Sequence, residues 1–262
     1  MLNLQGIPRL PISLRAIFII LSVLLLVEYN LLLAQGQDQQ QTAVLIEVQL
    51  PIQNTNIGGI TRALDSAIEN AGKAKVKNQR PWLLIRFLPL SENNQIRSDF
   101  GACNTLESYL SSPSLTRRCR TVAILNGKYA DHAFLPVLSC SKLIVSPETN
   151  IHGPEADTSL LTSEVKDDYR RVAEAHKHFP ASVIEAVLDP TVALHEVTTD
   201  ESTFFATGVE RQELFDKGKL NSSTAISVSG DILTLDKLIF NQQSAITVMP
   251  TNDTTLATEL NI

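Results

Sequence analysis

Apolar runs and helically spaced apolar positions alternate along the first half of the chain. The strands are near-continuous apolar segments, and the segments between them carry apolar residues three and four positions apart. Strands of this kind are typical of parallel sheets that are covered on both faces. We therefore expect an α/β fold of stacked, right-handed βαβ units, with strands at 42–50, 82–90, 120–126 and 141–147 and helices at 57–71 and from Gly101.

The pattern changes after Pro147. It predicts helices over 161–179 and from Pro180, then an antiparallel strand pair and a short helix that ends at Gly218. The sequence HKH, residues 176–178, is expected to be a solvated helix surface. From residue 221 the signals weaken, and 251–262 is expected to be a frayed tail. We therefore place one domain at 42–220 and a weakly defined C-terminal extension at 221–262.

The N-terminal segment has the organisation of a secretory signal peptide. Arg9 and Arg15 precede an apolar run at 16–27, and a small-x-small site follows at 34–36. This predicts a signal peptide at 1–36, a flexible leader at 37–41 and export to the periplasm or the extracellular space. The alternative is an uncleaved membrane anchor formed by residues 16–33.

Composition narrows the classes of function. A chain of 262 residues can bury one substantial core. The net charge is −6 and the basic residues are dispersed, which argues against a nucleic-acid partner. The three cysteines lack zinc-site spacing, and no dinucleotide, Walker or G-x-S-x-G motif is present. We expect no metal and no cofactor.

The order of these elements, with three longer segments, resembles a known superfamily. The segments are LPIQNTNIGGITRALDSAIENA, WLLIRFLPL with the following FGAC, and TVAILNGKYADHAFLPVLSCSKLIVSPETNIHGPE. Together they resemble the ClpP/crotonase superfamily and, within it, bacterial exported or membrane-linked serine proteases of the NfeD and signal-peptide-peptidase types. The resemblance implies a serine at the start of the helix after the third strand, a lysine base, and backbone N–H groups that stabilise an oxyanion.

The positions that match this machinery have partly changed. The nucleophile position falls on Asp131, and the nearest candidate for the lysine base is Lys166. The resemblance places the oxyanion-type backbone groups at Gly101, Ala102 and His132. It thus implies a retained protease scaffold without its nucleophile.

Several of these residues have a structural alternative. Asp131 fits a helix N-cap better than a catalytic carboxylate. His132 could be a general base or a hydrogen-bonded structural residue. Cys103 could be a reactive thiol or a small buried residue. Cys119 and Cys140 are both expected at the same edge of the sheet, where they could form a disulfide.

Three functions are compatible with this pattern. The first is a non-catalytic exported protein whose former cleft binds a peptide or protein, or serves assembly. The second is an active peptidase with a rearranged site, using His132 or Lys166 with a serine such as Ser139. The third is a subunit of a structural homo-oligomer. A thioester ligand would also suit a crotonase-type frame, but predicted export argues against it.

Overall fold

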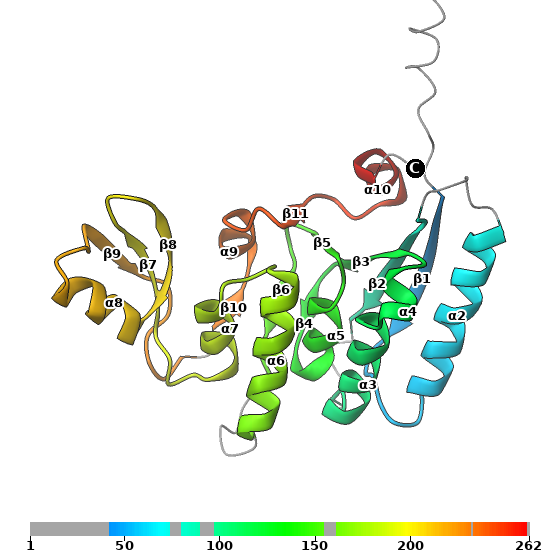
Figure 1. The fold of residues 1–262 in the computed structure, drawn as a ribbon, viewed down its shortest axis with the longest axis horizontal. Helices are drawn as coiled ribbons and strands as arrows, with labels where there is room; N and C mark the ends of the chain where they lie inside the picture. Colours follow the sequence, from blue (N-terminus) through cyan, green and yellow to red (C-terminus); the bar gives the residue numbers. More distant parts are fainter. Residues whose placement is uncertain (1–41, 74–79, 90–96, 155–160, 232, 261–262) are drawn as a thin grey trace, which may run out of the picture. The chain divides into compact units, whose positions relative to one another are not determined.

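The computed structural model describes residues 42–73, 80–89, 97–154, 161–231 and 233–260. Their centre is a five-stranded sheet in the order β1-β2-β3-β5-β11, in which every neighbouring pair is parallel (Figure 1). The expected α/β class with stacked βαβ units is confirmed. The strands are β1 (Ala43–Gln49), β2 (Trp82–Leu88), β3 (Arg120–Leu125), β5 (Lys142–Val145) and β11 (Ile246–Val248).

Helices cover one face of this sheet and pack into the larger core. The apolar face of α2 buries Leu64, Ala67, Ile68 and Ala71, as its three- and four-residue spacing predicts. The same core receives side chains from the other helices of this face. These helices are α3 (Phe100–Leu110), α4 (Pro113–Thr116), α5 (Phe134–Leu138), α6 (Ser163–His176) and α7 (Ala181–Leu188), beside α2 (Ile57–Lys73).

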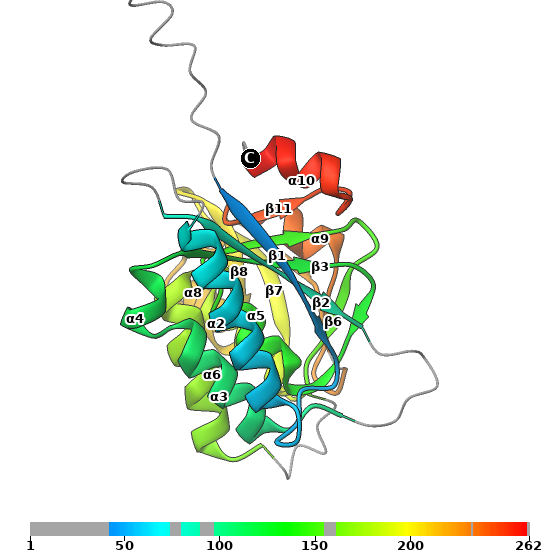
Figure 2. The ribbon, with the colours of Figure 1, turned by 90° about the vertical axis from the view of Figure 1, so that its right-hand side faces the viewer.

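The second face of the sheet carries a smaller core. Alternate residues of the central strands, among them Val122 and Ile124, pack here against Leu256 and Leu260 of α10 (Asp253–Leu260). The position of α10 beside the sheet can be followed in Figure 2. Coverage of both faces explains why β2, β3 and β5 are almost entirely apolar. It also contradicts the expected frayed tail, because the last described helix is part of the core.

Two small sheets complete the described chain. The expected antiparallel pair is β7 (Leu194–Thr198) with β8 (Thr203–Thr207), and β9 (Ser222–Ala225) extends it. The other sheet joins β6 (Asn150–His152) to β4 (Lys128–Tyr129) and β10 (Thr234–Leu235). The residues after 220 therefore reach all three sheets. The remaining elements are α8 (Gly208–Asp216), α9 (Lys237–Asn241) and the 3-10 turn η1 (Asp131–Ala133).

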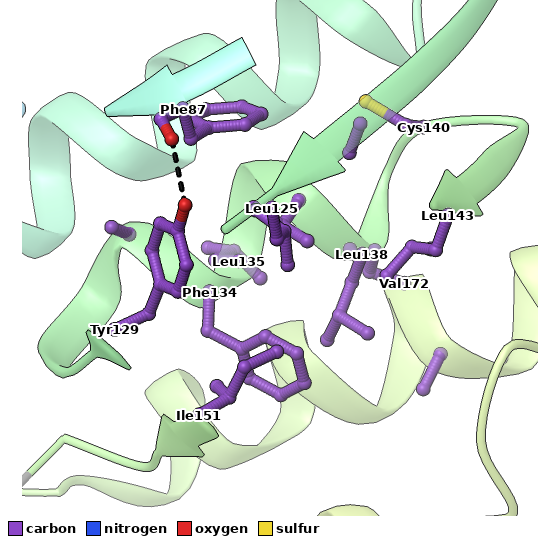
Figure 3. Packing of buried hydrophobic residues seen from close by; sticks show 14 of the residues in the cluster. Phe87, Leu125, Tyr129, Phe134, Leu135, Leu138, Cys140, Leu143, Ile151 and Val172 are labelled. Atoms are coloured by element: carbon purple, nitrogen blue, oxygen red, sulfur yellow. Dashed lines mark hydrogen bonds between the residues drawn. The ribbon is translucent and has the colours of Figure 1, made fainter. Parts of the chain in front are cut away.

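A buried tyrosine, Tyr129, packs in the core around α5 and forms hydrogen bonds to backbone groups. In Figure 3 the Tyr129 ring points toward β2, where its hydroxyl donates to the Phe87 carbonyl at 2.7 Å. The same hydroxyl accepts the backbone N–H of Asn126 at 2.8 Å. Burial raises the pKa of Tyr129 to about 12, so the group stays a neutral donor. These bonds fix the turn that leads from β3 to η1.

The expected Cys119–Cys140 disulfide is absent from the structure. Both residues are free, buried cysteines. Each thiol instead donates to a carbonyl four residues earlier, Cys119 to Leu115 and Cys140 to Pro136, at 3.7 Å. Burial raises the pKa of Cys119 to about 11 and that of Cys140 to about 12, so both remain thiols at neutral pH.

Candidate functional site

The residue at the expected nucleophile position, Asp131, is buried, and its carboxylate accepts two hydrogen bonds. Asp131 lies in the turn between β4 and α5, with 4 % of its surface exposed. Its φ angle is +72°, a left-handed conformation that aspartate tolerates better than most residues. One oxygen accepts the N–H of Ala133 and the other accepts the N–H of Ser98, each at 2.8 Å. Asp131 therefore ties its own turn to the loop before α3.

That loop is in turn tied to the one after β1. The Ser98 hydroxyl accepts the N–H of Ile52 at 3.1 Å, and the Asp99 N–H donates to the Ile52 carbonyl at 2.8 Å. The Asn54 amide donates to the Asp99 carboxylate at 2.5 Å. Three loops at the carboxyl ends of neighbouring parallel strands are thus cross-linked, at the edge where α/β proteins build their sites.

Of the three expected oxyanion donors, the Gly101 N–H is occupied and Ala102 belongs to a buried helical turn. The Gly101 N–H donates to the Asp99 carboxylate at 2.9 Å, because Asp99 is the N-cap of α3. Ala102 is fully buried in the first turn of the same helix, and His132 lies in η1 between Asp131 and Ala133. The carboxylates of Asp99 and Asp131 therefore each accept an N–H beside the positions at which the resemblance predicts an oxyanion hole. Their negative charge disfavours a second anion at this place.

His132 is half-buried beside aromatic residues. Its Nδ1 lies 3.4 Å from the Tyr169 hydroxyl, and its ring meets the Phe100 ring edge-on with 5.2 Å between centroids. Burial lowers the pKa of His132, although Asp131 and Asp99 act in the opposite direction. The imidazole is therefore neutral at neutral pH. Among the described contacts its hydroxyl partner is a tyrosine, not a serine.

Cys103 lies close to this group but is not activated. Its side chain is fully buried. Burial, followed by the charges of Asp131 and Asp99, raises the pKa of Cys103. A reactive cysteine needs the reverse, an electropositive and accessible environment. The geometry supports the small buried residue over the reactive thiol.

The remaining candidates for a rearranged peptidase are engaged elsewhere. The Lys166 ammonium forms an ion pair with Asp189 at 2.8 Å, and this hydrogen bond lowers the pKa of Asp189 to about 2. The Ser139 hydroxyl is buried and donates to the Pro136 carbonyl at 2.7 Å. Among the described residues, the Ser139 hydroxyl forms no hydrogen bond with Lys166 or His132.

The sequence pattern also did not predict that one histidine is buried. His178, expected on a solvated surface, is 2 % exposed. Its Nε2 lies 2.6 Å from the Cys140 carbonyl, while its Nδ1 is buried without a hydrogen-bond partner among the described atoms. Its ring stacks on His176 with 6.0 Å between centroids. Burial lowers the pKa of His178 to about 4. The expectation was wrong because the helix ends at His176, and the left-handed Lys177 turns the chain back toward the core.

Two general features of the described residues bear on the class of site. Residues 42–260, without the undescribed gaps, include no group of three or more histidines, cysteines or acidic residues that could hold a metal ion. Within the same residues, no helix has the length and apolar character needed to cross a bilayer. The predicted signal peptide at 1–36, the leader at 37–41 and the alternative anchor at 16–33 lie outside the described residues.

Comparison with known proteins gives a likeness in fold. No model of a known protein family matches the sequence, and no curated protein matches it. Similar solved structures include an enoyl-CoA hydratase/isomerase family protein from Silicibacter pomeroyi, at 12 % identity over 83 % of this chain and 77 % of that one, with a TM-score of 0.45.

Two further structures are similar to a smaller part of the chain. An enoyl-CoA hydratase from Thermoplasma volcanium matches at 12 % identity over 66 % of this chain and 65 % of its own, with a TM-score of 0.38. A peptidase from Plasmodium falciparum matches at 13 % identity over 64 % of this chain and 90 % of its own, also at 0.38. All three structures are less than 25 % identical to this chain and have TM-scores below 0.5. Similarity at this level does not transfer an activity.

Proposed function

We propose that the protein is an exported crotonase-fold module that resembles the NfeD-type and signal-peptide-peptidase-type proteases but performs no acyl transfer, and that it acts in binding or assembly. One observation carries the proposal. At the expected nucleophile position, Asp131 holds two loop amides with its carboxylate. The residue at the position of the expected nucleophile therefore stabilises the scaffold.

The chemistry of acyl transfer explains why this arrangement favours an inactive protein. A serine hydroxyl becomes a nucleophile only beside a base, and the tetrahedral intermediate needs free N–H donors. Here the candidate base Lys166 is held by Asp189, and the Gly101 N–H is bonded to Asp99. A substrate carbonyl would meet a carboxylate in place of a hydroxyl.

Labelling with a fluorophosphonate probe tests this proposal. The purified protein is treated with the probe and assayed for casein cleavage, alongside Ser139→Ala as the control for the rearranged peptidase. We expect no serine to be labelled and no casein to be cleaved. Labelling of the wild type that disappears in Ser139→Ala would overturn the proposal and establish the peptidase.

Export is tested separately, because it is supported by the N-terminal sequence alone. If the signal peptide is cleaved after Gly36, the mature protein recovered outside the cytoplasm begins at Gln37. Mass spectrometry of the N-terminal peptide gives the answer. An intact N-terminus in the membrane fraction would favour the anchor at 16–33, and an intact N-terminus in the cytosol would overturn export.

A further inference from the structure

Among the residues that the structure describes, strand β1 is an edge of the main sheet with a row of outward backbone groups. The Thr42 carbonyl accepts the Trp82 N–H, and the Leu50 N–H donates to the Leu88 carbonyl. Alternate residues of a strand direct their backbone groups to opposite sides. The backbone groups of the even-numbered residues of β1 therefore bond to β2. The backbone N–H and C=O groups of the odd-numbered residues point away from the sheet; these residues are Ala43, Leu45, Glu47 and Gln49.

This edge carries few of the features that usually protect an edge strand. Natural edges are short, or contain proline, lysine or a bulge. β1 has seven residues, AVLIEVQ, with neither proline nor lysine, and it pairs with β2 in unbroken register. Its one charged residue, Glu47, is 3.3 Å from Arg86 of β2. Leu45 exposes 37 % of its surface.

A groove runs between this edge and α2. Its volume is about 340 Å³, and Ile46, Val48 and Ile60 give it an apolar lining. On the helix side the groove is lined by small residues of α2, including Gly59 and Ala63. The space beside Gly59 is open, because a Cβ added there would meet no atom within 4 Å. Figure 2 shows β1 at the front of the sheet with α2 beside it. A second body could therefore approach the helix closely while it pairs with the strand.

We propose that β1 pairs with β1 of a second copy of this chain, antiparallel about Ile46, and that α2 of each copy covers the groove of the other. This inference deepens the assembly role in the proposed function. With Ile46 on the twofold axis, Leu45 faces Glu47 of the second copy and Ala43 faces Gln49. All four outward residues of each strand then pair, which gives about eight hydrogen bonds between the chains.

The charges favour this register and a second copy as the occupant. A shift that centres the axis on Glu47 would place two carboxylates directly opposite each other, which destabilises a strand pair. With the axis at Ile46, each Glu47 faces a leucine and keeps its Arg86 partner. A second copy of the strand therefore pairs in this register with no like charges opposite each other. The resulting interface is isologous, the commonest form of a dimer.

Two substitutions at one position test the pairing by charge. Leu45→Glu places like charges opposite each other twice in the dimer, whereas Leu45→Lys places opposite charges there. Both alter the same exposed side chain, so their effects on folding are matched. In sedimentation velocity of the full chain at about 1 to 100 µM, we expect a dimer that Leu45→Glu weakens about tenfold or more and Leu45→Lys does not.

Cross-linking tests the register. Ile46→Cys places two thiols opposite each other across the axis, where cross-strand Cβ atoms are about 4.5–5.5 Å apart. Mild oxidation should link this variant into a covalent dimer and should leave the Leu45→Cys control unlinked. The native cysteines are buried, so their background is low.

Three results would overturn the inference. One is a monomer throughout the concentration range, and another is a dimer that both charge variants affect equally. The third is a strand from a different protein found on β1. None of them bears on the proposed loss of acyl transfer, which the fluorophosphonate assay tests independently.

Discussion

Replacement of Asp131 by alanine should destabilise the protein strongly. The carboxylate accepts two backbone N–H groups at 2.8 Å, and Ser98 and Ala133, which donate them, are both buried. Hydrogen bonds to a charged group contribute about 1.5–3 kcal/mol each, and a left-handed alanine costs about 1–2 kcal/mol. Bonds that share one group do not add fully. We expect Asp131→Ala to lower the free energy of unfolding by about 3–5 kcal/mol.

A variant series separates the two contributions. Asp131→Asn keeps one oxygen acceptor and tolerates the left-handed conformation, so it should cost only about 1–2 kcal/mol. Asp131→Gly avoids the strain of a left-handed alanine but does not restore the two hydrogen bonds. Its loss in free energy of unfolding should therefore lie between those of the other two variants. Urea unfolding followed by the fluorescence of Trp82, the single tryptophan, gives the free energies. An alanine variant within about 0.5 kcal/mol of the wild type would refute the cross-linking role.

The remaining predictions concern groups outside this turn. Because the pKa of His178 is about 4 in the folded protein and 6.5 when unfolded, stability should fall by about 3 kcal/mol as the pH drops from 6.5 to 4. Urea unfolding across this range should show that much less pH dependence in His178→Gln, and an unchanged dependence would contradict the assignment. Lys166→Met should change stability by less than about 1 kcal/mol, while the pKa of Asp189 rises from about 2 in an NMR titration. Tyr129→Phe should cost about 1–3 kcal/mol in thermal unfolding, because it removes both the donor to the carbonyl of buried Phe87 and the acceptor of the Asn126 N–H; no loss would mean that water replaces the hydroxyl.

The main sheet was predictable because its signals are local. Each of its first four strands is a near-continuous apolar run, and α2 shows its buried face in the spacing of Leu64, Ala67 and Ile68. The antiparallel pair β7 and β8 was equally visible, since it joins neighbours in the sequence across a short turn. Such patterns need no knowledge of distant residues.

The C-terminal elements were missed because their signals depend on contacts. β11 is three residues long and joins the sheet beside β5, about 100 residues earlier. α10 has only two fully buried residues, Leu256 and Leu260, in a segment of polar residues. A short strand or a lightly amphipathic helix becomes stable through the surface on which it packs. That surface is not visible in the local pattern.

Asp131 shows the same limit within the candidate site. The sequence identified a carboxylate at the start of a helical turn, and the bond to the Ala133 N–H agrees with a capping role. The cap position itself is one residue earlier, at Ala130, which has no side-chain bond. The second bond, to Ser98, reaches back 33 residues and could not be inferred from spacing. The resemblance predicts that a nucleophile is missing. Only the long-range partner shows that its replacement holds the loops together, which is why stability, and not catalysis, is the property we expect Asp131 to control.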